Sequence, residues 1–77
     1  MGAGLVKGSV SIAGHRTSLS LEPVFWKALR AAAATRGVAL NAVITEIDDA
    51  RTTNLSSAVR VWLFERAQAG SNLPSHL

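Results

Sequence analysis

A short amphipathic strand pattern, followed only by helical segments, is the feature that most restricts the fold of this chain. In residues 16–21, Thr17, Leu19 and Leu21 alternate with polar side chains. A period of two predicts a β-strand with one apolar and one polar face. The backbone N–H and C=O groups of a strand that packs on a core need hydrogen-bond partners. The chain therefore has to provide or recruit a second strand.

Two partners for this strand are possible. Residues 9–12 also alternate serine with apolar side chains, and Ala13-Gly14 follows them. Such a dipeptide is typical of a kink, a bulge or a tight turn. Either residues 9–12 fold back on 16–21, or the strand pairs with its copy in a second chain. The sequence leaves both alternatives open.

Three helices are predicted after the strand, at about residues 23–36, 40–50 and 55–69. Pro23 suits the first turn of a helix, and Gly37 suits the position just after one. Apolar residues recur at helical spacing in each segment. Together with the apolar strand residues they form the expected core or dimer interface, which comprises Leu19, Leu21, Phe25, Trp26, Leu29, Val43, Ile44, Ile47, Leu55, Val59, Trp62 and Leu63.

The third helix is apolar over much of its circumference. Val61, Leu63 and Phe64 add apolar surface beside the stripe that contains Trp62. A helix of this kind needs burial on more than one side. A chain of 77 residues without cysteine has little core to offer and no disulfide to stabilise it. We therefore expect a homodimer.

The composition and motifs of the chain argue against several classes of function. The chain has no cysteine and two histidines, so a thiolate zinc site is excluded and no metal or cofactor is expected. No nucleophile–base pair or phosphate-binding loop is evident, which argues against an enzyme. No apolar run approaches the roughly 20 residues that span a membrane, and the first residues lack the apolar core of a signal peptide. We therefore expect a cytoplasmic protein. Its net charge of +3 is compatible with nucleic acid.

Three stretches carry a family resemblance: GHRTSLSLEPVFWKAL, GVALNAVITEIDDA and NLSSAVRVWLFERA. In this order they resemble the ribbon-helix-helix family, in a short bacterial subfamily with an added C-terminal helix. The resemblance implies a mostly α fold with one N-terminal β-strand, in which two chains intertwine and pair their strands as a two-stranded antiparallel ribbon. It covers residues 9–69, which leaves residues 1–8 as a flexible arm and 70–77 as a flexible tail.

The polar strand face is the candidate DNA-reading surface. Because Leu19 and Leu21 are expected inside, Arg16, Ser18 and Ser20 face outward. The resemblance implies that this face enters the major groove of DNA, where an arginine can pair with guanine through two hydrogen bonds. Considered without the resemblance and the helices that follow, the same pattern is more typical of a plain solvated strand face.

Contacts to phosphate are expected elsewhere. The resemblance implies that the start of the second helix, at Leu40 and Asn41, binds the DNA backbone, since helix N-termini attract anions. Lys7 and His15 are further candidates for phosphate contact. The alternatives are an ordinary helix start at Asn41 and an exposed polar residue at His15.

Sequence-specific binding of double-stranded DNA by a transcriptional regulator is the function that these features favour. The main alternative is a protein-interaction module of the same fold, similar to antitoxins that bind a protein partner, here unknown. A dimer that has lost DNA binding is a third possibility, because Ser18 and Ser20 are short side chains. The operator is not evident from the sequence.

Overall fold

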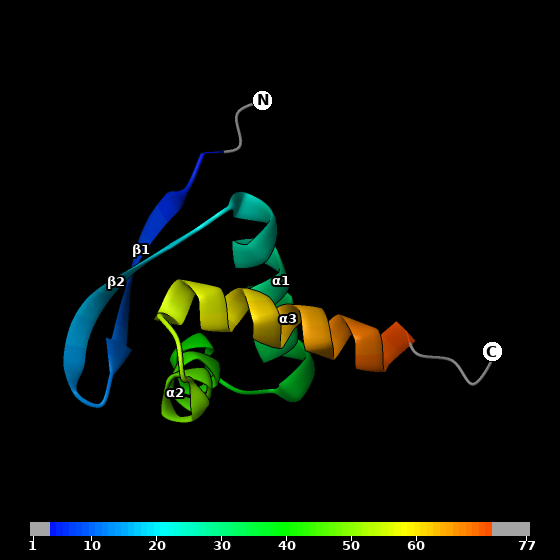
Figure 1. Ribbon diagram of the computed structural model, residues 1–77. Coiled ribbons are helices and arrows are strands. Elements are labelled where there is room, and N and C mark those ends of the chain that lie inside the picture. The colour runs from blue at the N-terminus through cyan, green and yellow to red at the C-terminus, as the bar shows by residue number, and fades with distance from the viewer. Residues whose placement is uncertain (1–3, 72–77) are drawn as a thin grey trace.

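A β-hairpin lies on one side of the molecule and three helices lie on the other (Figure 1). The computed structural model describes residues 4–71. The elements are β1 (Val6–Ile12), β2 (His15–Leu21), α1 (Pro23–Arg36), α2 (Leu40–Ala50) and α3 (Leu55–Ser71), in that order. No helix within residues 4–71 is long and apolar enough to cross a membrane.

The hairpin resolves the choice of strand partner within one chain. Ala13 and Gly14 both have positive φ, 52° and 81°, as a two-residue type I′ turn requires. The strands pair antiparallel, from Ile12 opposite His15 to Val6 opposite Leu21. Residues 9–12 therefore fold back on 16–21, and the single N-terminal strand that the resemblance implied is replaced by two. The tight turn was one of three interpretations of Ala13-Gly14, and the backbone shows that it is the right one.

The expected N-terminal arm is shorter than predicted, because β1 begins at Val6. The indole of Trp26 holds this end of the strand, with its Nε1–H donating to the Val6 carbonyl at 2.7 Å. Gly8 has no side chain to keep the ring away. Alternation is lost at Lys7-Gly8, so periodicity did not reveal the strand there. Residues 1–3 of the expected arm lie outside the described residues.

The third helix extends slightly past its predicted end. It continues through Gly70 to Ser71, because a glycine weakens a helix without ending it. The remaining residues of the expected tail, 72–77, lie outside the described part of the chain.

The core lies between the hairpin and the helices. Its largest fully buried side chains are those of Leu19, Leu21, Leu29, Val43, Ile44 and Val59. Trp26, Ile47 and Leu63 are also buried, whereas Phe25, Leu55 and Trp62 are half-buried against them.

One residue of the expected apolar strand face lies in solvent. Thr17 is exposed, whereas Val10, directly opposite on β1, is 3% exposed. The reason is that α2 packs against β1 at this end of the hairpin. The core thus lies under β1 near the turn and under β2 near α1.

Replacement of Gly8 by alanine should destabilise the fold. A Cβ at this position would lie 2.8 Å from two atoms of the Trp26 ring, and overpacking of this kind costs about 1–3 kcal/mol. Urea denaturation followed by tryptophan fluorescence measures the loss. Gly4→Ala is the control, because a Cβ there meets nothing within 4 Å. Equal denaturation midpoints for the two variants would contradict the packing of Trp26 on β1.

Candidate nucleic-acid interface

The outer face of the hairpin gathers two cations and four serines. Residues directly opposite each other in a hairpin share a face, and faces alternate along each strand. The register pairs Lys7 with Ser20, Ser9 with Ser18, and Ser11 with Arg16. All six side chains therefore lie on the side away from the buried Leu19 and Leu21. We call this surface the outer face; it consists of Lys7, Ser9, Ser11, Arg16, Ser18 and Ser20.

The outer face is open and basic. Five of its six residues are exposed and Ser20 is half-buried. It contains no carboxylate. Among residues 4–71 the ion pairs are Arg36–Glu46, Arg51–Asp48 and Arg60–Glu22, so neither Lys7 nor Arg16 is in one. Lys7 and Arg16 lie near opposite ends of the hairpin, about 14 Å apart at the usual strand spacing and rise.

His15 does not share this surface. It immediately follows the turn, opposite Ile12, and its position in the alternation places it on the same side as Thr17 and Leu19. Its side chain is exposed. The structure thus separates His15 from Arg16, although the two are neighbours in sequence.

The start of α2 lies against the hairpin. The Asn41 side-chain oxygen Oδ1 accepts a hydrogen bond from the Ser11 backbone N–H at 3.3 Å. Asn41 is exposed and Leu40 is half-buried against the core. Ala39, which precedes the helix, makes no side-chain cap. The N-terminus of α2 is therefore held beside β1, next to the outer face.

The other strand is held by α3. The Ser56 hydroxyl donates to the Ser20 carbonyl at 3.1 Å, and Arg60 pairs with Glu22 at 2.9 Å. Glu22 connects β2 to α1. The hydrogen bond from Arg60 holds the pKa of the Glu22 carboxyl below its usual value of 4.5, and the positive charge of Arg60 acts in the same direction. Helix α3 thus holds the end of β2, and the residue that connects β2 to α1, in place against the helices.

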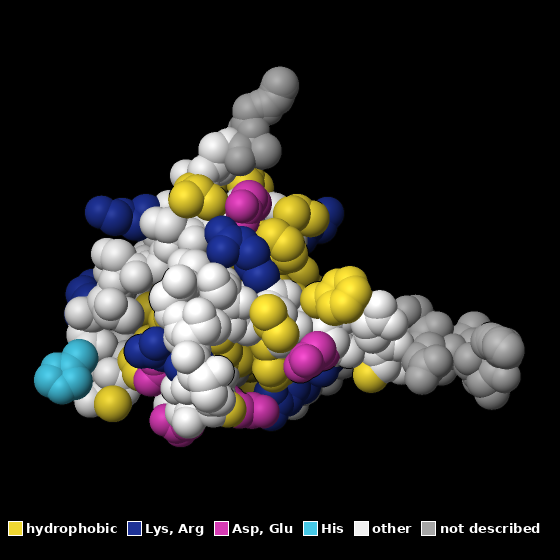
Figure 2. All heavy atoms as spheres, viewed as in Figure 1, with side chains coloured by type: hydrophobic (Ala, Val, Ile, Leu, Met, Phe, Trp, Pro, Cys, Tyr) yellow, Lys and Arg dark blue, Asp and Glu magenta, His cyan; other side chains and the backbone are white. Residues whose placement is uncertain are grey.

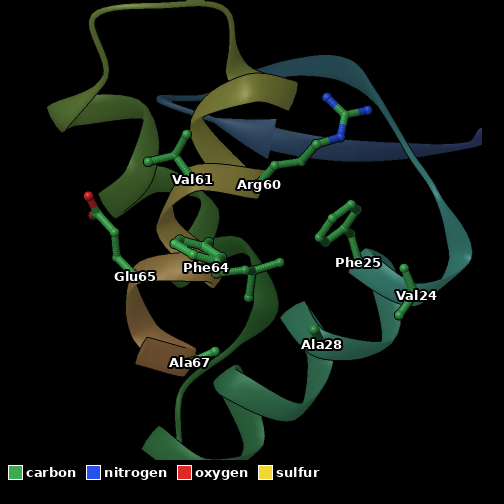
Figure 3. A pocket seen from close by; sticks show the side chains of 9 residues that line it. Val24, Phe25, Ala28, Arg60, Val61, Phe64, Glu65 and Ala67 are labelled. Atoms are coloured by element: carbon green, nitrogen blue, oxygen red, sulfur yellow. The ribbon is translucent and has the colours of Figure 1, made fainter. Parts of the chain in front are cut away.

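A second surface is an apolar groove of about 620 Å³ between α1 and α3. The rings of Phe25 and Phe64 face into it from opposite sides (Figure 3). Phe64 is 62% exposed and Val24 65%. We call this surface the α1–α3 groove; it is lined by Val24, Phe25, Ala28, Arg60, Val61, Leu63, Phe64, Glu65 and Ala67. In the view of Figure 2, exposed apolar side chains lie mainly right of centre, with smaller apolar areas elsewhere on the same face.

Comparison with known proteins agrees with this geometry. A sequence model of the ribbon-helix-helix domain matches residues 5–67. The chain belongs to the ribbon-helix-helix family. No curated protein and no solved structure matches the chain. The match places the chain in a family of DNA-binding regulators.

The sequence alone predicts only some of the residues of the outer face. Arg16, Ser18 and Ser20 were expected on one outward face, and the register places them there. Ser9 and Ser11 were missed as members of that face. Their alternation with apolar residues and the following Ala13-Gly14 were the available signal. Lys7 was expected in an arm and lies instead on β1. No group of three metal-ligating side chains occurs in the part of the chain that is described.

The ion pair between Glu22 and Arg60 should make the stability of the folded chain decrease at low pH. Because the pKa of Glu22 is lower in the folded protein, its stabilising effect is fully present above the ordinary carboxyl pKa and disappears as pH falls through the folded value. Thermal melts at pH 7 and pH 3 should therefore show a smaller acid-induced loss for Glu22→Gln than for the native chain. Asp49→Asn, which removes an exposed carboxylate, should retain the native dependence. An unchanged acid response in Glu22→Gln would contradict the assignment.

Proposed function

We propose that this chain is a homodimeric transcriptional regulator that binds double-stranded DNA sequence-specifically in the cytoplasm. The supporting observation is the outer face, where Lys7 and Arg16 lie among serines with no carboxylate nearby. In this family the strand before the first helix faces the major groove, which is wide enough to admit two strands. The proposal requires no catalytic group, metal or cofactor.

Arg16 is proposed as the main base-reading residue. Its guanidinium can donate two parallel hydrogen bonds to guanine O6 and N7, and it is not engaged in an ion pair within the described residues. Ser18 and Ser20 lie next to it on the same face and can each donate or accept a hydrogen bond. Short hydroxyls discriminate less between bases than a guanidinium does, so most of the specificity falls to Arg16.

Phosphate contact is proposed for the groups around this face. Lys7 offers a charge, and the N-terminus of α2 offers unpaired N–H groups and a positive dipole end at Leu40 and Asn41. The Asn41 Oδ1 is occupied by Ser11, which leaves its amide N–H groups as donors. His15 is exposed at the end of the hairpin and is proposed to touch the backbone there.

A second copy of the chain is proposed to cover the α1–α3 groove. Ser56, Arg60 and Phe64 are four residues apart along α3 and therefore share one helix face. That face begins at the β2 edge, where Ser56 bonds to Ser20, and ends in the groove. A copy that pairs with β2 would continue onto the groove. This gives the dimer two contiguous contacts, one polar and one apolar.

The same groove supports the alternative function. Exposed aromatic surface of this kind is also typical of a binding site for a different protein. In that case the chain would act as a protein-interaction module, and the groove would be empty when the chain is alone. Because a dimer of the same fold could also bind a protein partner, a salt-dependent gel shift with genomic DNA fragments separates the two functions.

Replacement of Phe64 should weaken the dimer without unfolding the chain. Phe64→Ser removes an aromatic side chain that is 62% exposed in one chain, so folding loses little, whereas association should weaken about tenfold or more. Sedimentation equilibrium measures the change. Leu5→Ser removes a side chain that is 58% exposed outside the groove and should not alter association. A native chain that stays monomeric at micromolar concentration would overturn the proposed dimer.

Replacement of Arg16 tests DNA reading. Arg16→Ala should lose about 1–3 kcal/mol per half-site on the preferred sequence, with a smaller loss on unrelated DNA. Arg16→Lys keeps the charge but not the two-pronged geometry, so it should retain non-specific binding and lose the preference. Lys27→Ala removes an exposed cation on α1 and is the control for net charge. Gel shifts at two salt concentrations measure these effects. Unchanged binding by Arg16→Ala would exclude the outer face as the reading surface.

A further inference from the structure

A cleft of about 350 Å³ lies between the second half of α2, the connection from α2 to α3, and α3 itself. We call it the α2–α3 cleft. Its lining is mainly apolar and includes one tryptophan; the residues concerned are Ile47, Ala50, Ala58, Val61 and Trp62. Sites for small molecules combine such a lining with a few polar groups, and this volume falls within their usual range. The cleft therefore has the size and lining of a site for a small organic molecule.

One stripe of α3 forms a wall of this cleft. Val61 and Trp62 lie three and four residues after Ala58, and Glu65 lies one further turn along, so all four share a helix face. Figure 3 shows the side chains of Val61 and Glu65 pointing away from Phe25. Both residues line the α1–α3 groove as well as the cleft, and they form the ridge between the two. Glu65 thus places a carboxylate at the border of the cleft.

Glu65 is the one charged side chain of the cleft without a partner in residues 4–71. Glu46 is paired with Arg36 at 2.8 Å. Arg51 is paired with Asp48 at 2.6 Å. The Glu65 carboxylate takes part in none of the ion pairs and side-chain hydrogen bonds of this part of the chain. Because Glu65 is also exposed, its charge is available to a cation that enters the cleft.

The surroundings of the cleft are acidic, unlike the outer face. Four of the five carboxylates of the chain lie on the second half of α2 or on the cleft side of α3, namely Glu46, Asp48, Asp49 and Glu65. Three arginines accompany them: Arg36 and Arg51 in the ion pairs, and Arg66, which lies 5.6 Å from the centroid of the Trp62 ring. One negative charge is left over, whereas the whole chain carries +3. This end of the molecule therefore attracts cations in preference to anions.

We propose that the α2–α3 cleft binds a small organic cation with an apolar body, such as an arylalkylamine. The body packs against the apolar lining, and the ammonium group pairs with the carboxylate of Glu65. Trp62 offers a further polar contact, because its indole N–H makes no hydrogen bond within the described residues, whereas the indole of Trp26 is bonded to Val6. The ligand is thus selected by its shape and its positive charge together.

This site is separate from the outer face. Asn41, which bonds to Ser11, and Ala50, which lines the cleft, lie near opposite ends of α2. They are about 14 Å apart along the helix axis. A ligand in the cleft therefore leaves the outer face uncovered, and its binding requires no DNA.

The two tryptophans of the chain allow the site to be tested by NMR. In a titration of the isotope-labelled native chain with phenethylamine at neutral pH, the indole N–H signal of Trp62 should shift and saturate, with a Kd that is about millimolar or tighter. The signal of Trp26, which is held by Val6, should stay in place. Trp62→Phe assigns the two signals. Phenethyl alcohol has the same ring and chain without the charge and should bind about three- to fivefold more weakly, as expected for an exposed ion pair. Hydrocinnamate, which is an anion, should bind more weakly still.

Replacement of Glu65 tests the source of the preference. Glu65→Gln keeps the size of the side chain and removes its charge, so phenethylamine should then bind no more tightly than phenethyl alcohol. Asp49→Asn is the matched control, because Asp49 is an exposed carboxylate on α2 that does not line the cleft; it should retain the preference.

Three results would overturn the site. They are equal binding of the amine and the alcohol by the native chain, a preference that survives Glu65→Gln, and a shift of the Trp26 signal in place of the Trp62 signal. None of these titrations contains DNA, so each of these results would leave the proposed function intact. Loss of DNA binding on replacement of Arg16 would in turn leave the cleft unaffected.

Discussion

The hydrogen bond from the Trp26 indole to the Val6 carbonyl holds the hairpin on the helices. It connects α1 to the first residue of β1, with the ring lying against the bare backbone at Gly8. The Lys7 end of β1 is held both by this contact and by its pairing with β2, where Val6 lies opposite Leu21 and Lys7 opposite Ser20. A buried tryptophan therefore helps to position Lys7, which lies between its two contacts at Val6 and Gly8, on the outer face.

Positive charge is distributed unevenly over the fold. Arg36, Arg51 and Arg60 are neutralised by carboxylates, and Arg30 and Arg66 lie over the rings of Trp26 and Trp62. These side chains stabilise helices and their contacts. Lys7 and Arg16 have no such role among the described residues, so their charge is available to an anion. The modest net charge of the chain thus understates the polarity of the outer face.

Much of the fold could be predicted from local patterns, and what could not depends on contacts between distant residues. The three helices and the strand at 16–21 follow from periodicity, Pro23 and Gly37. The start of β1 at Val6 depends on Trp26, twenty residues away, so no local pattern reveals it. For the same reason the bond between Asn41 and Ser11 was not foreseen. Arg16, Ser18 and Ser20 were predictable as one face because alternation within a single strand is enough to group them.

The hydrogen bond between Ser11 and Asn41 also limits how far the sheet can grow. Exposed strand edges are templates for further strands, and chains with two such edges can polymerise into fibres. Here Asn41, at the N-terminus of α2, accepts the outward N–H of Ser11, so the edge of β1 is blocked near the turn. In the proposed dimer, a two-fold contact through β2 would use the uncovered edge of each chain. The Asn41 amide thus shortens the stretch of β1 edge that another strand could extend.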